Sequence, residues 1–476
     1  MSDETLTRTG DRPAAPEERP SLVVRAVLVE GAPLRGAQAL PVLAFDGKRD
    51  VVLGRQAGDT GFSIPLDATL SRRHVRLRLV GLGPEDALLV EDLGSHNGTW
   101  VDGARIVRPT AVRAGQVIRV AGTALVVGAE PPERAAALRA RTPPGYVALS
   151  WASLQVWERV ERVAASDAGV LLTGPVGTGK TRLAQHLHDR SGRAGPFVSF
   201  NCSAIPVNLE EATLFGVSGG FIPGVREREG WITRARGGTL FLDELADMPP
   251  LAQAKLLDAF DPTDPGFIPV GGTARVRPSC RLVSATNKDV FALCAAGALR
   301  QDLLSRIVVA QVEVPPLAAR REDLVELLDR ALLRHGSSVD ALAPSAELVE
   351  SLLLARWTEN VRGLESLAAR LALGERLSPA DARRHADRGQ DGPPPELVPH
   401  SAGLAAHPVW PPEPVELLVL LRAHDFNVAA AAEALGRRRE TLSRLVTATF
   451  GRGGATAARR AWRVYEATGQ IPSPEA

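Results

Sequence analysis

Residues 169–181 read GVLLTGPVGTGKT. An apolar stretch suited to a buried strand is followed by a glycine-rich loop and then by the start of a helix at Lys180. The spacing G-x-x-x-x-G-K-T in this context predicts a phosphate-binding loop, because a glycine-rich turn and a helix N-terminus both present backbone N–H groups. The alternative is a chance glycine loop before a helix, which the strand–loop–helix context disfavours. The stretch therefore predicts an α/β fold that binds a nucleotide.

The chemistry of nucleotide hydrolysis assigns a role to each part of this segment. Glycines let the backbone wrap the phosphates, Lys180 places a cation on the β- and γ-phosphates, and Thr181 can ligate Mg²⁺. Further along, GGTLFLDE (237–244) places Asp243 and Glu244 at the end of a second buried strand, where a carboxylate that organises Mg²⁺ and a base for the attacking water are needed. We expect ATP and Mg²⁺ as ligands. The predicted loop contacts are Gly174, Pro175, Val176, Gly177, Thr178, Gly179, Lys180 and Thr181.

Composition limits the remaining possibilities. With 476 residues, 45% of them hydrophobic and 23% charged, the chain has the values of a globular protein of two to four domains. A net charge of +1 excludes a general polyanion binder, so any nucleic-acid surface must be local. The three cysteines show no metal-like pairing, the first residues lack a signal peptide, and no apolar run approaches the ~18 residues of a membrane span. We predict a cytoplasmic protein without membrane contact.

The local pattern divides the chain into segments. Residues 22–129 show short alternating runs such as VRLRLV (75–80), which places Val75, Leu77 and Leu79 on one face of a strand. We predict a multidomain protein with a β-sandwich, an α/β P-loop core with a helical lid, and an all-α unit. The predicted boundaries are 1–21 disordered lead, 22–129 sandwich, 130–146 linker, 147–317 α/β core, 318–388 lid, 389–412 linker, 413–450 helical unit and 451–476 basic tail.

The middle of the chain resembles a known family. FVSFNCSAIP (197–206), LFG (214–216), GGTLFLDELADMPPLAQAKLL (237–257), PVGG (269–272), RLVSATN (281–287) and WTENVRGLE (357–365) stand in the order found in the AAA+ ATPases of bacterial enhancer-binding proteins, which activate sigma-54 RNA polymerase. The resemblance covers roughly 147–375. It implies that Asn201 holds Glu244 until nucleotide is sensed, that Asn287 is a sensor, and that Arg362 is a lid arginine that contacts nucleotide.

The same resemblance makes catalysis a property of an assembly. Arg300 and Arg306 in LRQDLLSRI (299–307) match the pair that reaches the nucleotide of a neighbouring subunit, which implies a closed ring, a homo-hexamer. A guanidinium on the γ-phosphate is worth ~10³–10⁵ in rate, so a monomer should hydrolyse ATP poorly. The alternative is a pair of ordinary surface ion pairs. The implied catalytic set is Lys180, Asn201, Asp243, Glu244, Arg300 and Arg306.

One loop departs from the family. Its usual sequence Gly-Ala-Phe-Thr-Gly-Ala contacts the sigma factor, and the corresponding stretch reads GFIPGV (220–225). The hinge glycines Gly220 and Gly224 are kept, Ile222 replaces an aromatic ring, and Pro223 replaces a hydroxyl and fixes φ. Phe221, one position earlier, could substitute in part, and the alternative is that Phe221 and Ile222 pack on the domain. The ATPase motifs are intact while the sigma-54 contact is altered.

Three islands in the β region resemble the forkhead-associated (FHA) domain, a β-sandwich whose loops bind phosphothreonine. They are VVLGRQ (51–56), SRRHVRL (71–77) and VEDLGSHNGTWVDG (90–103). The resemblance implies that Gly54, His74 and Gly98 are structural. Arginines suit the charge of a phosphothreonine, and a serine hydroxyl and an asparagine amide add hydrogen bonds. Asn97-Gly98 could instead be only a tight turn. The implied phosphopeptide contacts are Arg55, Ser71, Arg72 and Asn97.

Residues 414–446, PVELLVLLRAHDFNVAAAAEALGRRRETLSRLV, predict three helices. Asn427 can cap the second helix, Gly436 can end it, and Leu442, Leu445 and Val446 would face inward in the third. The segment resembles the Fis-type helix-turn-helix that ends most enhancer-binding proteins. The alternative is a small helical bundle with solvated arginines. The predicted DNA contacts are Arg437, Arg438, Arg439, Thr441, Ser443 and Arg444.

Together these segments predict an ATP-dependent transcriptional regulator of the sigma-54 enhancer-binding type, controlled by phosphothreonine recognition. Its expected partners are an upstream DNA site, a phosphothreonine-containing protein, further copies of itself and sigma-54 RNA polymerase. The alternative function is a sigma-54-independent DNA-binding adaptor or repressor in which ATP controls ring assembly, which the altered GFIPGV loop favours. A protein unfoldase is a third class, and the predicted DNA-binding segment disfavours it.

Overall fold

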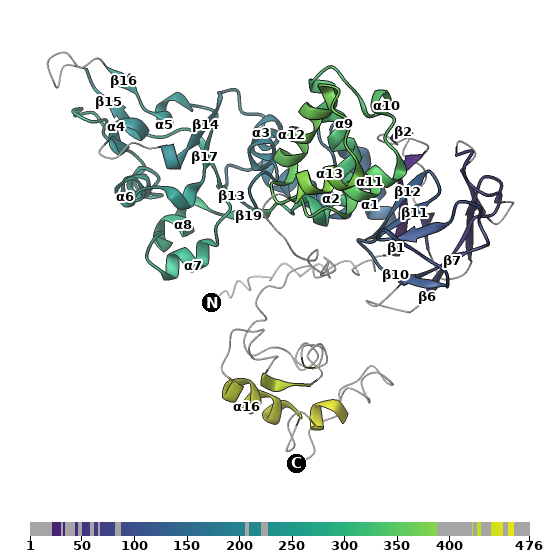
Figure 1. Cartoon of the computed structure of the whole chain (residues 1–476). Helices are drawn as coiled ribbons and strands as arrows, with labels where there is room; N and C mark the ends of the chain where they lie inside the picture. Colours follow the sequence, from purple (N-terminus) through teal and green to yellow (C-terminus); the bar gives the residue numbers. More distant parts are fainter. Residues whose placement is uncertain are drawn as a thin grey trace, which may run out of the picture. The chain divides into compact units, whose positions relative to one another are not determined.

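The computed structural model divides the chain into two units, Met1–Pro399 and His400–Ala476, which are described separately. Figure 1 shows the helices and strands of both units. The residues that the structure describes are 21–29, 32–33, 43–45, 50–57, 61–64, 67–80, 87–204, 209–219, 227–387, 421, 426–429, 439–450 and 456–460.

The N-terminal part of the first unit is a sandwich of two β-sheets. One sheet has the order β2-β1-β12-β11-β8-β9, with β3 also paired to β1, and the other has the order β10-β7-β6-β4-β5. The first sheet contains β1 (Ser21–Val29), β2 (Ala32–Pro33), β3 (Leu43–Ala44), β8 (Thr99–Val101), β9 (Ala104–Arg105), β11 (Val117–Val120) and β12 (Thr123–Glu130). The second contains β4 (Val51–Gly54), β5 (Gly61–Ser63), β6 (Val75–Val80), β7 (Ala87–Asp92) and β10 (Thr110–Val112). The predicted sandwich is confirmed.

Strand β6 shows how the alternating pattern forms this core. Val75 and Leu77 are fully buried between the sheets, whereas Arg76 and Arg78 face outward. Arg76 donates to Glu91 on β7 at 2.7 Å, and Arg78 forms a two-pronged ion pair with Asp50 at 2.8 and 2.9 Å. The period of two therefore separates apolar from charged side chains as predicted.

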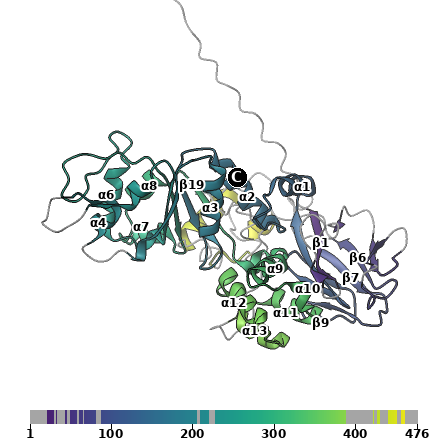
Figure 2. The ribbon, with the colours of Figure 1, turned by 90° about the horizontal axis from the view of Figure 1, so that it is seen from above.

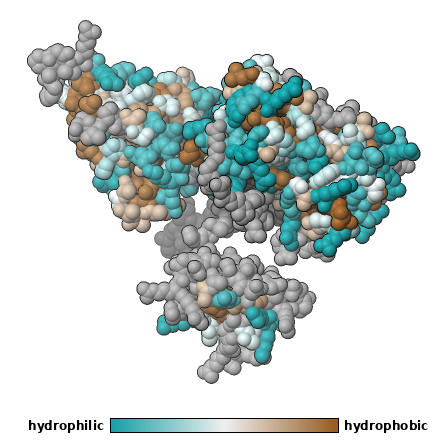
Figure 3. Space-filling model, viewed as in Figure 1, coloured by the Kyte–Doolittle hydropathy of each residue, from teal (hydrophilic) through white to brown (hydrophobic). Residues whose placement is uncertain are grey.

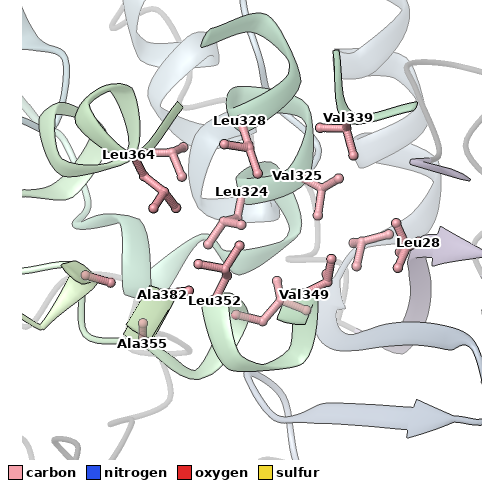
Figure 4. Close-up of a cluster of buried hydrophobic side chains, with 14 of the residues drawn as sticks. Leu28, Leu324, Val325, Leu328, Val339, Val349, Leu352, Ala355, Leu364 and Ala382 are labelled. Atoms are coloured by element: carbon pink, nitrogen blue, oxygen red, sulfur yellow. The ribbon is translucent and has the colours of Figure 1, made fainter. Parts of the chain in front are cut away.

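The outer face of the larger sheet is covered as well. Side chains of β1, β11 and β12, among them Val27, Leu28 and Val126, belong to the same apolar cluster as the lid helices. Figure 4 shows Leu28 of the sandwich beside Val349 and Val325 of the lid. Because helices bury this face, β1 (SLVVRAVLV) is apolar on both sides instead of alternating. The sandwich and the lid share one hydrophobic core.

The interval 130–146, predicted as a linker, contains a helix instead. Helix α1 (Pro132–Arg141) begins with proline at its first position, carries Glu133 in the first turn and arginines in the last turn. Ala135 and Leu138 are buried against Ala148 and Leu154. The alanine-rich stretch after the prolines favours a helix, and its apolar face gives the helix a packing partner. The segment predicted as a linker thus contains a packed helix that was not among the predicted elements.

The α/β core has a parallel sheet in the order β14-β17-β18-β13-β19. Its strands are β13 (Val170–Thr173), β14 (Phe197–Asn201), β17 (Thr239–Asp243), β18 (Arg281–Thr286) and β19 (Ala310–Glu313). Strands β15 (Gly216–Val217) and β16 (Arg228–Glu229) form a two-stranded hairpin on either side of residues 220–226. These residues, which contain the predicted sigma-contact loop, lie outside the described residues. The helices are α2 (Trp151–Ala164), α3 (Lys180–Arg190), α4 (Glu210–Phe215), α5 (Trp231–Arg234), α6 (Pro250–Ala259), α7 (Val290–Ala295) and α8 (Gln301–Ile307).

The lid follows the last strand of the core. It consists of α9 (Leu324–Arg334), α10 (Val339–Leu342), α11 (Ala346–Leu354), α12 (Asn360–Ala372) and α13 (Pro379–Ala386), as predicted for a purely helical segment. In Figures 1 and 2 these helices lie beside the sheet that contains β1. Ser345 caps α11 by accepting a hydrogen bond from the Leu348 N–H at 3.2 Å.

The second unit is described only in part. Helix α16 (Arg439–Phe450) buries Leu442 and Val446, while Leu445 is half-buried. The Asn427 side-chain oxygen accepts from the Ala429 N–H at 3.1 Å, which confirms the predicted cap. Arg437, Arg438 and Gly436 lie outside the described residues.

The surface of the described residues is mostly hydrophilic on the face shown in Figure 3, with apolar residues in small separate patches. Within the described ranges, every helix is too short or too polar to cross a bilayer.

Candidate functional site

The predicted phosphate-binding loop joins β13 to α3. Gly174, Gly177 and Gly179 have positive φ angles of 142°, 75° and 101°, which favour glycine. A Cβ on Gly177 would lie 2.1 Å from the Glu359 carbonyl oxygen, and a Cβ on Gly174 would lie 2.4 Å from the Val314 carbonyl oxygen. At Gly179 no heavy atom lies within 4 Å of that position. Two of the glycines therefore permit close packing, and the third keeps the entrance to α3 open for a ligand.

Lys180 is held inside this loop. Its side chain is 7% exposed, and the ammonium donates to the carbonyl oxygens of Gly174 at 2.9 Å and Pro175 at 3.1 Å. Burial lowers the pKa of Lys180, and the charges of Glu244 and Asp243 act in the opposite direction. The cation is thus preorganised in the loop that would surround phosphate oxygens.

Asp243 and Glu244 close the site at the end of β17. The Glu244 backbone is left-handed with φ 50°, and one carboxylate oxygen of Glu244 is buried without a hydrogen-bond partner among the described residues. Buried polar atoms are normally paired, so this oxygen indicates a place for a water or a ligand. The loop geometry, the buried cation and this free oxygen fit a nucleoside triphosphate, with Thr181 and Asp243 as the residues that would hold Mg²⁺.

Asn201 lies next to this pair, since β14 aligns it with Asp243 of β17. Its amide oxygen accepts hydrogen bonds from the Ser203 N–H at 2.9 Å and the Ser203 hydroxyl at 2.8 Å. The predicted contact between Asn201 and Glu244 stays a prediction. Asn287, the predicted sensor, directly follows β18 and is exposed.

The lid contacts the phosphate-binding loop through residues that sequence reasoning missed. Asn360, at the start of α12, donates to the Val176 carbonyl at 2.9 Å, and the Val361 N–H donates to the Gly177 carbonyl at 2.9 Å. Arg320 donates to the Thr178 carbonyl at 2.7 Å. Asn360 stands inside WTENVRGLE, two positions before the predicted Arg362, so its place in that motif was the available signal.

Arg362 extends from the same helix. A Cβ on Gly177 would lie 3.1 Å from the Arg362 Cβ, and the charge of Arg362 lowers the pKa of Lys180. The structure therefore brings Arg362 to the loop, as the prediction requires.

Arg300 and Arg306 are occupied elsewhere in the single chain. Arg300 pairs with Asp302 at 2.7 and 3.0 Å, and Arg306 pairs with Asp261 at 2.7 Å. Both arginines are on the exposed surface of the α8 region. Their predicted role in a neighbouring subunit's site remains a prediction, since this single chain contains no neighbour.

The predicted phosphopeptide contacts gather at one end of the sandwich. The Arg55 N–H donates to the Ser71 carbonyl at 3.0 Å, the His96 N–H donates to the Ser71 hydroxyl at 3.1 Å, and the Asn97 amide donates to the Thr69 carbonyl at 2.7 Å. Arg55 and Arg72 are exposed. Three loops are thus fastened together by hydrogen bonds beneath two exposed cations.

His74 and Gly54 support these loops, as predicted. His74 is fully buried, its Nδ1 accepts from the Ser71 N–H at 3.2 Å, and its Nε2 lies 2.9 Å from the Gly98 carbonyl oxygen. Burial lowers the pKa of His74, which fits a neutral ring that carries its proton on Nε2. A Cβ on Gly54 would lie 2.2 Å from the Arg72 carbonyl oxygen, so only glycine fits there.

Buried polar contacts fasten the sandwich to the lid. Arg119 of β11 is 7% exposed and donates to Glu350 of α11 at 2.7 Å and to Glu347 at 2.9 Å. The Gly103 N–H also donates to Glu350, at 3.1 Å. Arg321, the neighbour of Arg320, donates to the Gly115 carbonyl of the sandwich at 2.6 Å.

Three residues of the segment 320–323 therefore contact three different parts of the unit. Arg320 contacts the phosphate-binding loop and Arg321 contacts the sandwich. The Asp323 carboxylate accepts from the Leu149 and Ser150 N–H groups before α2, at 2.7 and 2.9 Å. This segment physically links the nucleotide site to the sandwich.

Comparisons with known proteins agree with this division. The family profile described as "Sigma-54 interaction domain" matches residues 147–313, and the profile described as "FHA domain" matches residues 51–121.

Similar curated proteins carry the names of regulators. The chain is 39% identical to the response regulator protein FleR of Pseudomonas aeruginosa, over 50% of this chain and 51% of that protein. It is 41% identical to the DNA-binding transcriptional regulator NtrC of Bradyrhizobium sp., over 48% of this chain and 47% of that protein. It is 36% identical to the pathogenicity locus probable regulatory protein WtsA of Pantoea stewartii, over 48% of this chain and 71% of that protein. The chain spans about half the length of FleR and NtrC.

Proposed function

Because the chain belongs to the family of transcriptional regulators that carry the sigma-54 interaction domain, we propose that it is an ATP-dependent regulator of the sigma-54 enhancer-binding type. The observation that carries this proposal is that Lys180 lies in the glycine-rich loop, with Arg362 beside the loop and the charge of Glu244 acting on Lys180. One carboxylate oxygen of Glu244 is buried without a partner among the described residues. We assign the regulator to the cytoplasm, where ATP and DNA are available.

The residues of this site divide the work of hydrolysis. Lys180 and the loop N–H groups bind the phosphates, and the lid residues Asn360 and Arg362 cover them. Glu244 accepts a proton from the attacking water. At the same time the water oxygen bonds to the γ-phosphorus, and the bond between the γ-phosphorus and the leaving ADP breaks. Mg²⁺, when bound through Thr181 and Asp243, supplies neutralisation of the phosphate charge.

In the proposed hexameric ring, Arg306 leaves Asp261 and completes the site of the neighbouring subunit. The exposed ion pair between them is weak, so its exchange for a phosphate contact costs little. This assigns the transition-state cation to the ring rather than to the single chain.

Steady-state ATPase measured across protein concentration tests this assignment. The specific activity of the wild type should rise with protein concentration. Arg306→Ala should lower the specific activity by about 10³-fold while ATP binding persists. Arg334→Ala, which removes another exposed arginine in an ion pair, is the matched control and should behave like the wild type. Equal specific activity of the wild type after dilution to single chains would contradict the proposal.

DNA and polymerase complete the proposed function. The second unit, with Arg439, Thr441, Ser443 and Arg444 on or at α16, would bind an upstream site. Open-complex formation by the sigma-54 holoenzyme on a promoter with that site tests the activator role.

The adaptor alternative rests on GFIPGV. Under that alternative, the double variant Ile222→Phe and Pro223→Thr should gain sigma-54 binding that the wild type lacks.

Phosphothreonine recognition by the sandwich is the proposed signal that controls the ATPase. Two exposed cations on a hydrogen-bonded platform suit a phosphate group, and the platform contains the Ser71 hydroxyl, which accepts from the His96 N–H, and the Asn97 amide, which donates to Thr69. Arg119 connects the sandwich to the lid, and the neighbouring residues Arg321 and Arg320 contact the sandwich and the phosphate-binding loop respectively. Phosphopeptide binding is therefore proposed to control the ATPase.

A further inference from the structure

A groove separates the end of the sandwich from the lid. Its volume is about 480 Å³, and its walls come from Thr69, Asn97, Trp100 and Arg119 on the sandwich side and from residues 343–347 on the lid side. Asn97 is a proposed phosphopeptide contact, and Thr69 is its hydrogen-bond partner, two residues before Ser71. The groove therefore begins where the proposed phosphothreonine site ends.

The accessible charge of the groove is negative on the lid side. The Arg119 guanidinium lies 3.7 Å from the centre of the Trp100 ring, is 7% exposed, and is already paired with Glu350 and Glu347. Glu347 is 55% exposed. Its Oε1 accepts from Arg119, and a carboxylate can accept several hydrogen bonds.

We propose that this groove is a second part of the phosphopeptide site, in which the lid selects a basic residue beside the phosphothreonine. A peptide anchored by its phosphate at Arg55 and Arg72 enters the groove past Asn97. A lysine or arginine of that peptide then pairs with Glu347. The ligand class is a phosphothreonine peptide with a nearby cation, and this inference rests on the proposed phosphothreonine recognition.

This arrangement makes the lid part of the receptor. Helix α11, which carries Glu347, packs in the same apolar cluster as α12, whose first residues contact the phosphate-binding loop. A ligand that contacts both the sandwich and α11 stabilises the arrangement of the lid in which the groove is formed. Nucleotide binding also depends on the lid. Peptide binding and nucleotide binding are therefore coupled, and the coupling is reciprocal.

The test uses the full chain and a degenerate phosphothreonine peptide library with its unphosphorylated counterpart. Retained peptides are sequenced, and the affinities of the enriched sequence are measured by fluorescence anisotropy. The wild type should enrich lysine or arginine at one position near the phosphothreonine. Glu347→Gln, which keeps the shape of the side chain, should lose this enrichment and weaken the selected peptide about fivefold or more, with phosphate-dependent binding retained.

Controls separate this inference from the proposed function. Glu365→Gln removes another exposed, ion-paired carboxylate of the lid and should leave selection unchanged. Arg72→Ala should weaken phosphate-dependent binding about tenfold or more in every sequence context. If the wild type retains no phosphopeptide, phosphothreonine recognition itself fails, and this inference fails with it. If phosphopeptides bind and Glu347→Gln selects the same residues as the wild type, the lid has no part in recognition and only this inference is overturned.

Discussion

The nucleotide site and the phosphothreonine site both suit phosphate groups, yet they are built in opposite ways. Lys180 is buried and bonded to carbonyl oxygens of its own loop. Arg55 and Arg72 extend from the surface, and only the loops beneath them are fastened. The phosphate-binding loop is bonded to α12 through Asn360, whereas the proposed peptide contacts lie at one end of the sandwich.

This difference follows from what each site would do. Hydrolysis needs charges fixed in a dry place before the reaction starts, because reorganisation during the reaction raises the barrier. Recognition of a peptide needs cations that a phosphorylated side chain can reach without unfolding anything. Burial of the cation thus indicates catalysis in one region, and exposure indicates reversible binding in the other.

The largest expected effect tests the buried site. Glu244→Gln removes the proposed base but keeps the shape of the side chain, so ATP turnover should fall by about 10³-fold while ATP affinity stays similar. Turnover by a coupled assay and binding of a fluorescent ATP analogue measure the two quantities separately. Unchanged turnover would show that the buried carboxylate is structural and would remove the contrast between the regions.

The contact between the regions should give the next largest effect. Arg119→Ala leaves Glu350, which is 7% exposed, without its buried cation, so the free energy of unfolding should fall by about 3 kcal/mol. Arg78→Ala breaks the exposed pair with Asp50 and should cost less than about 1 kcal/mol. Urea unfolding of both variants measures the difference. Equal losses would mean that the sandwich and the lid are not joined through Arg119.

The exposed site should respond more mildly. Arg72→Ala removes one charge-assisted contact and should weaken phosphothreonine-peptide binding by about 1.5–3 kcal/mol, without effect on basal ATP turnover. Its neighbour Arg73→Ala is the matched control, and titration calorimetry is the measurement. A variant that loses stability as well as affinity would show that Arg72 belongs to the scaffold.

A pH dependence of stability is expected at Glu322, in the segment that links the two regions. Burial raises the pKa of this carboxyl to about 7 from an ordinary value of 4.5. Because the folded chain holds this proton more tightly than the unfolded chain, the free energy of unfolding should fall as pH rises from 4.5 to about 7 and then level off. Glu322→Gln should flatten this trend, which urea unfolding at several pH values would reveal. A trend identical to that of the wild type would contradict the shifted pKa.

Sequence reasoning reached the elements whose pattern is local. The alternation of VRLRLV, the scaffold role of His74 and the cap at Asn427 are all confirmed by the structure. The helix within 130–146 is not among the predicted elements, although proline is favoured at a helix start. The apolar run SLVVRAVLV (21–29) lacks alternation, which is typical of a strand covered on both faces.

Residue spacing along short stretches was enough to predict the phosphate-binding loop, the sandwich and the helical lid. The folded arrangement was needed to reveal that Arg119 contacts Glu350, that Arg320 and Arg321 contact different parts of the unit, and that a groove joins Asn97 to the lid. These pairs are far apart in the chain, and nothing in a charged residue's neighbours reveals which distant partner will share its burial. The reason is physical: local propensity acts over a few residues, whereas the pairing of buried charges depends on which surfaces the folded chain brings together.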